Sequence, residues 1–551
     1  MSNVRPPAGV RQGGASARDA GVTARQAGTG ARGTRPAARE PWWEQAASFI
    51  SFFIYLLILK SFFLPLFIIP TGSMAATLCG AHAVHTCPNC GVEYAIGYVE
   101  QWPPGYQPVV QCPNCRWREY GGGRGTLDPR RPQPDGFLAT PLRPSAGDRI
   151  FVHGWYFDGP VMGLDDLKPQ RWDVVVFKVP TDGEQNYIKR LIGLPNEKIE
   201  LINGDVFKDG RLEPKTADAQ RSLWFPYYDH DYPPQQTARS AAYHPRWAPV
   251  TPSVGWSDLK TRVLRFDGSQ SGRGEIQFVT NPEATTAPGK VEDVYAYNEP
   301  APERALNTVA DVRLSAELNL ARCAQDGYVE LCLSRGEHRF YARLGGDGRI
   351  ALEHETDAAP RRQLWGEHRL EKPGQPVRLG LCHVDGAVVV EINGQPVIES
   401  SRTEYEIAPE LARAQAAHPT PPTIRIAAAG VTATLRHVLI ERDVYYTSDV
   451  RLAGRPGFGV AGDPIQLGPD EYYLLGDNSP NSRDARFAFS RSDRPPVIGP
   501  HLTARKDYHP GTVPGDQLIG RAFFVYWPGF LPLTSSGPNV LPDLGRARWI
   551  R

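Results

Sequence analysis

Residues 187–210 read YIKRLIGLPNEKIELINGDVFKDG. Its first part predicts a β-strand in which Lys189 is flanked by Ile188, Leu191 and Ile192. A lysine in such surroundings can lie in a desolvated site, which favours the neutral amine and lowers its pKa. A neutral amine can accept the proton of a serine hydroxyl, so a serine and a buried lysine form a catalytic dyad without histidine. The alternative is a lysine that faces outward from its strand.

The composition limits the class of protein. A chain of 551 residues predicts two to four folded units, because domains usually contain about 100–200 residues. The 61 Lys and Arg residues nearly balance the 60 Asp and Glu residues, which argues against a dedicated nucleic-acid binder. Eight cysteines are too few for a disulfide scaffold of this length. The 54 glycines and 52 prolines, set among short alternating runs, favour sheet-rich domains over a helical bundle.

Five further segments carry candidate chemistry or predicted strands. A serine lies in a Pro- and Gly-containing turn, where irregular backbone can present its hydroxyl to a substrate. The segments are, in chain order, IIPTGSMAATL (68–78), GDRIFVHGWYFD (147–158) with RWDVVVFKVP (171–180), YYLLGDNSPNSRDARFAF (472–489) and GDQLIGRAFFVYWP (515–528).

The N-terminal region predicts a membrane anchor. Residues 1–41 are rich in Gly, Ala, Arg and Pro and predict a disordered cytoplasmic tail. Residues 42–62 begin with Trp42 and Trp43 and continue as an apolar run. We expect this run to be a single transmembrane anchor, because crossing a bilayer core of about 30 Å takes about 20 residues. A buried core helix and a cleaved signal peptide are the alternatives. Positive charge before the run places the N-terminus in the cytoplasm and the rest of the chain outside it.

Taken in order, these segments resemble type I signal peptidase, the bacterial leader peptidase that removes signal peptides with a Ser–Lys dyad. The motifs that carry the resemblance are P-[ST]-G-S-M, G-D-R, D-V-V-V-F, K-R-[LI]-I-G-L-P, G-D-N-x-x-N-S-x-D-x-R and a closing G-[KR]-A. They lie within residues 50–80, 145–215 and 450–530. The resemblance implies a mainly β catalytic domain on one N-terminal transmembrane helix.

The resemblance also implies roles for individual residues. Ser73 would be the nucleophile and Lys189 the general base. The backbone N–H of Ser73 and the hydroxyl of Thr71 would form the oxyanion hole. Ser482 would hydrogen-bond and orient the Lys189 amine. The remaining implied residues are structural: a salt bridge between Asp484 and Arg486, Met74 packed beside the active site, and a turn formed by Gly476, Asp477 and Asn478.

Substrate, partners and location follow from the same resemblance. The substrates would be the signal peptides of exported preproteins, cut after small residues without any cofactor for catalysis. The partners would be the lipid bilayer and, through functional proximity, the export translocon, with no nucleic acid. The protein would be a single-pass protein of the inner membrane with an extracytoplasmic catalytic domain. Cleavage should fall at acid pH as the lysine becomes protonated.

Two Cys-x-x-Cys pairs predict a structural zinc site within a first insertion at residues 87–120. They are Cys87-Pro-Asn-Cys90 and Cys112-Pro-Asn-Cys115, with 21 residues between them. This spacing matches a four-thiolate site and resembles a zinc ribbon. Two disulfides are the alternative, because this part of the chain is expected outside the cytoplasm.

A second insertion is predicted at residues 216–445. Within it, residues 255–442 show period-two patterns that indicate a β-sandwich. The segment VRLSAELNLA places five residues on one face of a strand, namely Val312, Leu314, Ala316, Leu318 and Leu320. Hairpin turns are predicted at Asp347-Gly348 and Asn393-Gly394. Part of the insertion loosely resembles concanavalin-like or laminin-G-like sandwiches, which often bind glycans, and Cys323, Cys332 and Cys382 are expected to be buried thiols.

Two functions from different classes remain. The first is a membrane-anchored serine endopeptidase whose catalytic domain has three parts, residues 63–86, 140–215 and 446–540. The second is a membrane-tethered binding protein in which the sandwich works and the peptidase frame is an inactive scaffold. The joint presence of a candidate nucleophile, base and orienting serine favours the endopeptidase.

Overall fold

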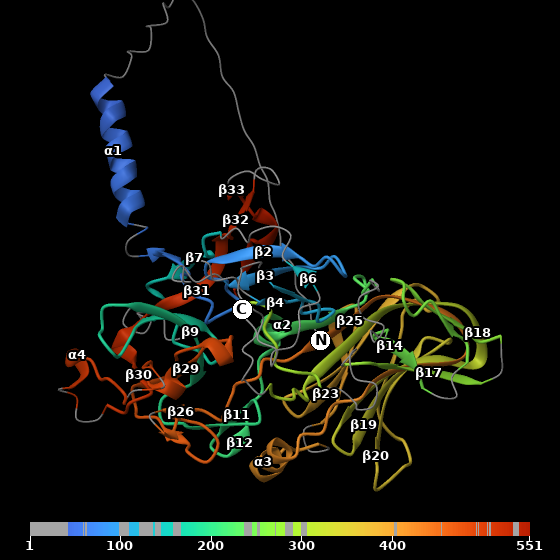
Figure 1. Cartoon of the computed structure of the whole chain (residues 1–551). Coiled ribbons are helices and arrows are strands. Elements are labelled where there is room, and N and C mark those ends of the chain that lie inside the picture. The colour runs from blue at the N-terminus through green and yellow to red at the C-terminus, as the bar shows by residue number, and fades with distance from the viewer. Residues whose placement is uncertain are drawn as a thin grey trace, which may run out of the picture. The chain divides into compact units, whose positions relative to one another are not determined.

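The chain is described by a computed structural model that is mainly β (Figure 1). It describes residues 42–58, 60, 63–97, 109–120, 136–137, 145–157, 167–235, 245–250, 254–269, 272–280, 290–298, 306–401, 405–452, 454–491, 493, 495–503, 505, 508–532 and 539–550. The predicted disordered tail at residues 1–41 lies outside this described part.

The chain separates into two units, Met1–Leu57 and Ile58–Arg551. The described residues of the first unit all belong to helix α1 (Trp42–Ile58), which has 17 residues and buries none of them. Across the described ranges, none of the helices has both the length and the apolarity needed to cross a membrane.

An eight-stranded sheet, here called the catalytic sheet, contains most of the motif segments of the second unit. Its main order is β1-β7-β31-β8-β9-β29-β30, and β34 pairs with β31. The strands are β1 (Leu66–Ile68), β7 (Arg149–His153), β8 (Val174–Lys178), β9 (Asn186–Gly193), β29 (Glu471–Leu475), β30 (Val513–Pro514), β31 (Leu518–Trp527) and β34 (Arg548–Trp549). The sheet therefore brings together segments that are more than 400 residues apart in the chain.

Smaller sheets flank the catalytic sheet. A four-stranded sheet has the order β12-β11-β10-β28, and the cysteine region forms β2-β3 and β4-β5-β6. The bounds are β10 (Lys198–Ile202), β11 (Asp205–Lys208), β12 (Arg211–Leu212), β28 (Ile465–Gln466), β2 (His82–Thr86), β3 (Glu93–Gly97), β4 (Val109–Gln111), β5 (Arg118–Tyr120) and β6 (Gly136–Phe137). Two further pairs are β26 (Arg451–Leu452) with β27 (Arg455–Pro456) and β32 (Phe530–Pro532) with β33 (Asn539–Pro542).

Short helices join these strands. They are α2 (Ala217–Leu223), α3 (Pro409–Ala417), α4 (Pro500–Thr503) and the 3₁₀ turns η3 (Ser479–Asn481), η4 (Ala485–Phe487), η5 (Gly515–Gln517) and η6 (Leu544–Arg546). Thr216 begins α2 because its hydroxyl accepts a hydrogen bond from the Ala219 N–H.

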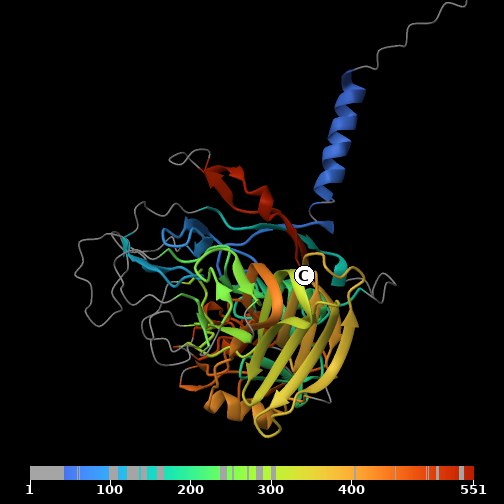
Figure 2. The ribbon, with the colours of Figure 1, turned by 90° about the vertical axis from the view of Figure 1, so that its right-hand side faces the viewer.

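Thirteen strands between residues 225 and 442 form one hydrogen-bonded network, here called the insertion sheet. Figure 2 faces the broad array of its yellow strands. The strands are β13 (Phe225–Asp229), β14 (Trp247–Pro249), β15 (Trp256–Ser257), β16 (Leu264–Asp267), β17 (Arg273–Phe278), β18 (Val312–Arg335), β19 (His338–Gly345), β20 (Arg349–Thr356), β21 (Gln363–Arg369), β22 (Val377–Val384), β23 (Ala387–Ile392), β24 (Gln395–Glu399) and β25 (Ile424–Arg442).

Two long strands organise the insertion sheet. β18 has 24 residues and β25 has 19, and they pair along most of their lengths with three register shifts. The first part of β18 also pairs with β22, whereas its last part pairs with β19. Register shifts in long strands increase twist and bend the strand, and residues from both parts contribute to one apolar core. This topology establishes a mainly β insertion, and the concanavalin-like or laminin-G-like form stays a prediction.

The local predictions for the insertion are largely confirmed. The hairpins β19-β20 and β23-β24 turn at the predicted dipeptides, and Gly348, Asn393 and Gly394 all have positive φ. Four of the five residues predicted on one face of β18 belong to the apolar core, and the fifth, Leu320, packs against that core. Cys323 is exposed, so the prediction that it is buried was wrong. It lies at a register shift of β18, where the strand's pairing with β25 is interrupted.

A buried charge cluster joins the insertion sheet to the four-stranded sheet. Lys215 Nζ lies 2.5 Å from Asp385 Oδ1 and 2.7 Å from Asp443 Oδ2. Arg335 pairs with Asp311 and, at 3.6 Å, with Asp205. These residues come from β11, the segment before α2 and the ends of insertion strands. Opposite charges from separate segments therefore compensate one another where the two sheets meet.

Candidate functional site

Strand β9 carries Lys189 between two neighbours of the catalytic sheet. Lys189 is opposite Val175 of β8, and the next residue, Arg190, is opposite Leu475 at the end of β29. Successive side chains of a strand point to opposite faces, so Lys189 and Arg190 diverge. Both are buried, with exposed fractions of 3% and 0%. The register also places the turn after Leu475 next to the lysine strand.

The turn that carries Ser73 is fastened at both ends to the G-D-R segment. The Ile69 N–H donates to the Asp148 carbonyl over 2.9 Å, and the Asp148 N–H donates to the Cys79 carbonyl over 2.8 Å. The Asp148 carboxylate accepts the Cys79 N–H over 3.0 Å. Gly147 has no room for a side chain, because a Cβ there would lie 1.8 Å from the Ile69 carbonyl oxygen. The glycine and aspartate of this motif thus hold the serine turn.

The candidate nucleophile and the candidate base meet in this structure. Lys189 Nζ lies 2.6 Å from Ser73 Oγ and 3.1 Å from the Ile188 carbonyl oxygen. Burial lowers the pKa of Lys189 to about 8. The negative charges of Asp484 and Asp477 oppose this shift, whereas the positive charge of Arg486 adds to it. Lys189 forms no ion pair with any described residue. An amine with this pKa is half neutral near pH 8, and its neutral form can accept the proton of the serine hydroxyl that it contacts.

The turn after β29 contains two buried ion pairs. Arg190 donates to both carboxylate oxygens of Asp477, over 2.8 and 2.7 Å. Arg486 donates to both oxygens of Asp484, over 2.9 and 2.7 Å. All four side chains are fully buried. Each carboxylate that influences Lys189 is therefore already occupied by its own arginine.

Gly476 and Asn478 connect this turn to the serine turn. The Asn478 N–H donates to the Ser73 carbonyl over 3.1 Å, and its side-chain amide donates to the Gly72 carbonyl over 2.8 Å. A Cβ at Gly476 would lie 2.5 Å from the Ser73 carbonyl oxygen and 2.2 Å from Ser482 Oγ. The two turns therefore pack backbone against backbone.

The predicted hydrogen bond from Ser482 to Lys189 is not formed in this structure. Ser482 is 5% exposed, and its Oγ has no hydrogen-bond partner in the described part of the chain. Lys189 directs its amine to Ser73 and to a backbone carbonyl instead. Ser482 nevertheless contacts the space above Gly476, next to the serine turn.

The other predicted site residues lie on or under the serine turn. Met74 is fully buried in a core cluster with Ile69 and Leu78. Thr71 is exposed, and neither its hydroxyl nor the Ser73 N–H donates a hydrogen bond to a described residue. Both donors are thus free to meet a developing oxyanion.

The four predicted metal ligands come together as thiols that are not joined by disulfide bonds. Their sulfurs all lie within 4.8 Å of one another, and the Cys87–Cys115 and Cys90–Cys112 sulfurs are 3.5 and 3.6 Å apart. A tetrahedral Zn²⁺ with Zn–S bonds of about 2.3 Å requires sulfur separations of about 3.8 Å.

The two knuckles are nearly equivalent in their backbone hydrogen bonds. The Gly91 and Arg116 N–H groups return to the carbonyls of Cys87 and Cys112, and both residues have positive φ. The Asn89 amide donates to Cys115 Sγ over 3.6 Å. The buried donor set therefore fits a closed structural zinc site, whereas the alternative disulfides are not formed.

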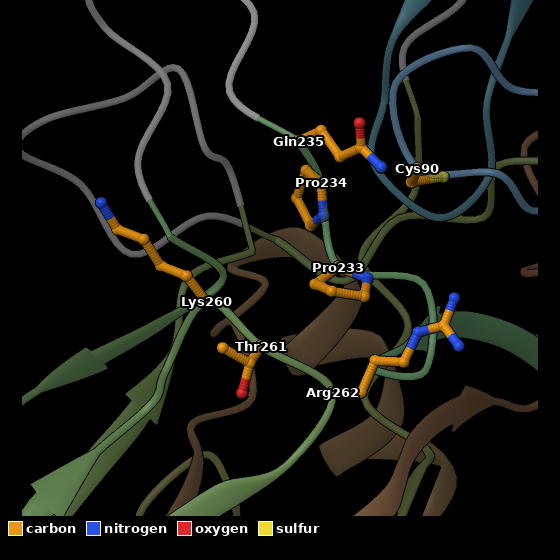
Figure 3. Close-up of a pocket in the computed structure, with 7 residues that line it drawn as sticks. All are labelled: Cys90, Pro233, Pro234, Gln235, Lys260, Thr261 and Arg262. Atoms are coloured by element: carbon orange, nitrogen blue, oxygen red, sulfur yellow. The ribbon is translucent and has the colours of Figure 1, made fainter.

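A pocket of about 450 Å³ lies beside this cluster (Figure 3). It is lined by Cys90, Pro233, Pro234, Gln235, Lys260, Thr261 and Arg262. None of these residues belongs to the Ser73 site, so the pocket does not provide the candidate substrate site.

Several site residues were missed by sequence reasoning. Arg190 and Asp148 lie inside quoted motifs, and a charged residue within an apolar strand motif was a usable signal. Tyr295, Tyr297 and Asn298 also contact the site. They lie in the second insertion, where no motif or spacing in the sequence links them to Ser73.

A serine hydroxyl bonded to a buried lysine amine has the arrangement of a Ser–Lys hydrolase site. The family described as "Signal peptidase, peptidase S26" matches residues 144–244 and 373–527. These two ranges make up less than half of the chain and include Lys189 and the turn after β29, but not Ser73.

Curated relatives match a shorter part of the chain. Signal peptidase I of Rickettsia prowazekii (strain Madrid E) is 44% identical over 64 residues, which are 11% of this chain and 22% of the relative. Signal peptidase I of Rickettsia typhi (strain ATCC VR-144 / Wilmington) is 49% identical over 47 residues, which are 8% of this chain and 18% of the relative. The chain thus spans about a fifth of the length of these relatives. The matches support a peptidase over the covered part.

Solved structures show only a weak likeness. The carbohydrate-binding module CBM66 from Bacillus subtilis is 10% identical, with a TM-score of 0.23 over 36% of this chain and 95% of that structure. A Bacillus licheniformis β-glucanase is 8% identical, with a TM-score of 0.25 over 38% of this chain and 95% of that structure. At such TM-scores the likeness carries no conclusion about ligand or function.

Proposed function

We propose that this protein is a serine endopeptidase that removes N-terminal signal peptides from exported preproteins after small residues. The observation that carries the proposal is the 2.6 Å contact between Lys189 Nζ and Ser73 Oγ in a buried setting that lowers the pKa of the lysine to about 8. The peptidase S26 match over residues 144–244 and 373–527 adds the substrate class.

In the proposed reaction, neutral Lys189 accepts the Ser73 hydroxyl proton while Oγ attacks the scissile carbonyl carbon. The resulting oxyanion receives hydrogen bonds from the Ser73 N–H and the Thr71 hydroxyl, each such donor contributing about 3–4 kcal/mol. Collapse breaks the C–N bond, and the lysine returns its proton to the leaving amine. Water then attacks the acyl-enzyme ester, with Lys189 again as the base, and regenerates the free serine.

Ser482 has a second-order role in this proposal. Its hydroxyl, which has no partner within the described ranges, lies next to the serine turn and can turn toward the lysine or the substrate when a peptide excludes water from the site. Asp484 with Arg486 and Asp477 with Arg190 hold the surrounding turn. Because the arginine neutralises the aspartate within each pair, the surroundings of the lysine carry almost no net charge.

Four-thiolate zinc is proposed as a structural element and has no part in the reaction. Cys87, Cys90, Cys112 and Cys115 would hold it, and the metal would stabilise the small sheets around them. Metal analysis of the purified protein should find one zinc per chain, and Cys112→Ser should lower that content. Absence of zinc from the unaltered protein, or an unchanged content in Cys112→Ser, would exclude the site.

We further propose that residues 42–62 hold the protein at the bilayer of the inner membrane, with the N-terminus in the cytoplasm. The apolar sequence of α1 and the Trp pair at its start support a lipid-facing segment. Protein expressed with this segment should stay in the membrane pellet after alkaline carbonate washing. Protein lacking residues 42–62 should be released, and its retention would argue against the anchor.

Cleavage of a preprotein with an Ala-x-Ala site tests the enzymatic proposal directly. The protein in detergent or in a bilayer should cut after the small-residue motif, and Ser73→Ala should abolish cutting. Ser269→Ala, at an exposed serine of the insertion, is the matched control and should cut normally. A folded protein that cuts no preprotein, or a Ser73→Ala variant that still cuts, would refute the proposal.

A further inference from the structure

Residues 290–298, here called the strap, leave the insertion and enter the candidate active site. They lie between β17 and β18, outside the ranges that match the peptidase family. Val291 belongs to the insertion core, Tyr295 to the core of the catalytic sheet, and Tyr297 to a small cluster with Ala75 and Cys79. Within seven residues the strap therefore passes from the insertion to the underside of the serine turn.

Tyr297 supports the serine turn from below. Its ring lies against Gly72, where an added Cβ would be 2.0 Å from Cε1 of the ring. Its hydroxyl donates to the Ala81 carbonyl over 2.8 Å, and its own carbonyl accepts the Gly97 N–H over 2.8 Å. Tyr297 thus holds the serine turn against strand β3 of the cysteine region.

Asn298 reaches the same turn through Asn478. The two side-chain amides exchange hydrogen bonds of 2.7 Å in both directions, and Asn481 donates to Asn298 over 3.2 Å. Asn478 in turn binds the carbonyls of Gly72 and Ser73. Loss of Asn298 would leave the buried Asn478 amide without the partner that sets its orientation.

Tyr295 connects the strap to the lysine side of the dyad. Its hydroxyl donates to the Asp477 carbonyl over 2.8 Å. Asp477 binds Arg190, the residue next to Lys189 on β9. The strap consequently contacts both the turn that carries the nucleophile and the ion pair beside the base.

We propose that Asn298 and Tyr297 are positioning residues that hold Ser73 in register with Lys189, so that the insertion is an integral part of the catalytic machinery. This inference rests on the proposed endopeptidase function. Proton transfer requires the two groups at hydrogen-bond distance, and a displacement of about 1 Å can cost about 100-fold in rate. The strap is suited to preventing such a displacement, because Tyr297 packs against the serine turn and Asn298 forms hydrogen bonds with Asn478 of the turn after β29.

The test compares Asn298→Ala and Tyr297→Phe with the control Asn319→Ala, at an exposed asparagine of β18. We expect Asn298→Ala to lower kcat for preprotein cleavage by about 10–100-fold, with KM nearly unchanged and the acid limb of the pH profile displaced. Tyr297→Phe keeps the ring under Gly72 and should lose less. Asn319→Ala should match the unaltered protein.

Hydrogen exchange of the peptide covering residues 70–80 supplies a readout that does not need catalysis. Asn298→Ala should speed exchange in this peptide while the insertion strands exchange as before. Unchanged kcat and unchanged exchange in both variants would overturn the inference. If the unaltered protein cuts no preprotein, the proposed function fails, whereas exchange in residues 70–80 still decides whether the strap orders the serine turn.

Discussion

Two lysines of this protein with buried amines differ in their chemistry. Lys189 is 3% exposed as a whole residue, and the side chain of Lys215 is 5% exposed. Burial lowers the pKa of Lys189 to about 8, and no carboxylate among the described residues forms an ion pair with its amine. Burial also acts to lower the pKa of Lys215, but contacts with Asp385 and Asp443 outweigh it and raise the pKa.

Desolvation alone therefore does not make a buried lysine a general base. At Lys189 the nearby carboxylates of Asp477 and Asp484 are occupied by Arg190 and Arg486. At Lys215 the carboxylates of Asp385 and Asp443 form no ion pair with an arginine in the described part of the chain, and they bind the lysine directly. Whether the nearby carboxylates are already paired with arginines, and not the extent of burial, decides whether a buried lysine is a proton acceptor or a structural cation.

The largest effect is expected at Lys189. Lys189→Met should slow preprotein cleavage by about 10⁴-fold or more, as expected when a dyad loses one member. It should leave the free energy of unfolding unchanged or raise it, because an apolar side chain replaces an amine without an ion pair. Single-turnover cleavage and denaturant unfolding measure the two quantities. A variant that still cuts within tenfold of the unaltered rate would remove Lys189 as the base.

The converse result is expected at Lys215. Lys215→Met leaves the buried carboxylates of Asp385 and Asp443 without their cation, which should lower the free energy of unfolding by about 3–5 kcal/mol. The folded fraction should retain normal kcat. Lys208→Met, at a half-exposed lysine paired with Glu213, is the control and should cost less than about 1 kcal/mol. Equal losses of unfolding free energy in Lys215→Met and Lys208→Met would show that Lys215 is not needed to compensate the buried carboxylates.

An effect of intermediate size is expected in the pH dependence of cleavage, which tests whether Lys189 has a lowered pKa. Protonation of Lys189 removes the base, so activity should be lost as pH falls through about 8. Below that value log kcat/KM, which reports the ionisation of the free enzyme, should fall with unit slope, which predicts a loss of about 100-fold at pH 6. Single-turnover rates between pH 5.5 and about 10 check this expectation. A flat profile down to pH 6 would mean that the acceptor is not a lysine with a lowered pKa.

The smallest effect concerns two buried serines of the turn after β29. Ser482→Ala removes a hydroxyl that has no hydrogen-bond partner among the described residues, and it should change the free energy of unfolding by zero to about 1 kcal/mol in the stabilising direction. Ser479→Ala removes an acceptor of the buried Arg486 and should cost about 1–3 kcal/mol. Denaturant unfolding of both variants makes the comparison. A larger loss at Ser482 than at Ser479 would show that Ser482 does form a stabilising hydrogen bond.

The local structure of this protein could be derived from its sequence. Alternation along residues 312–320 predicted a half-buried strand, and the Asp-Gly and Asn-Gly dipeptides predicted hairpins. The paired Cys-x-x-Cys spacing predicted the assembly of four thiols. The pairing of Ser73 with Lys189 was implied by the resemblance of the ordered motifs to type I signal peptidase. Each of the other inferences depends on neighbours in the chain or on a spacing that the sequence displays.

The tertiary structure alone decided which distant groups compensate one another. The pairs of Arg190 with Asp477 and of Lys215 with Asp385 join segments 287 and 170 residues apart, and no periodicity encodes such contacts. The strap became visible only when Asn298 lay beside Asn478. The sequence determined which side chains are available for proton transfer. Folding determined which of them lost their water without gaining a counter-charge, and that difference sets whether a lysine can act as a base.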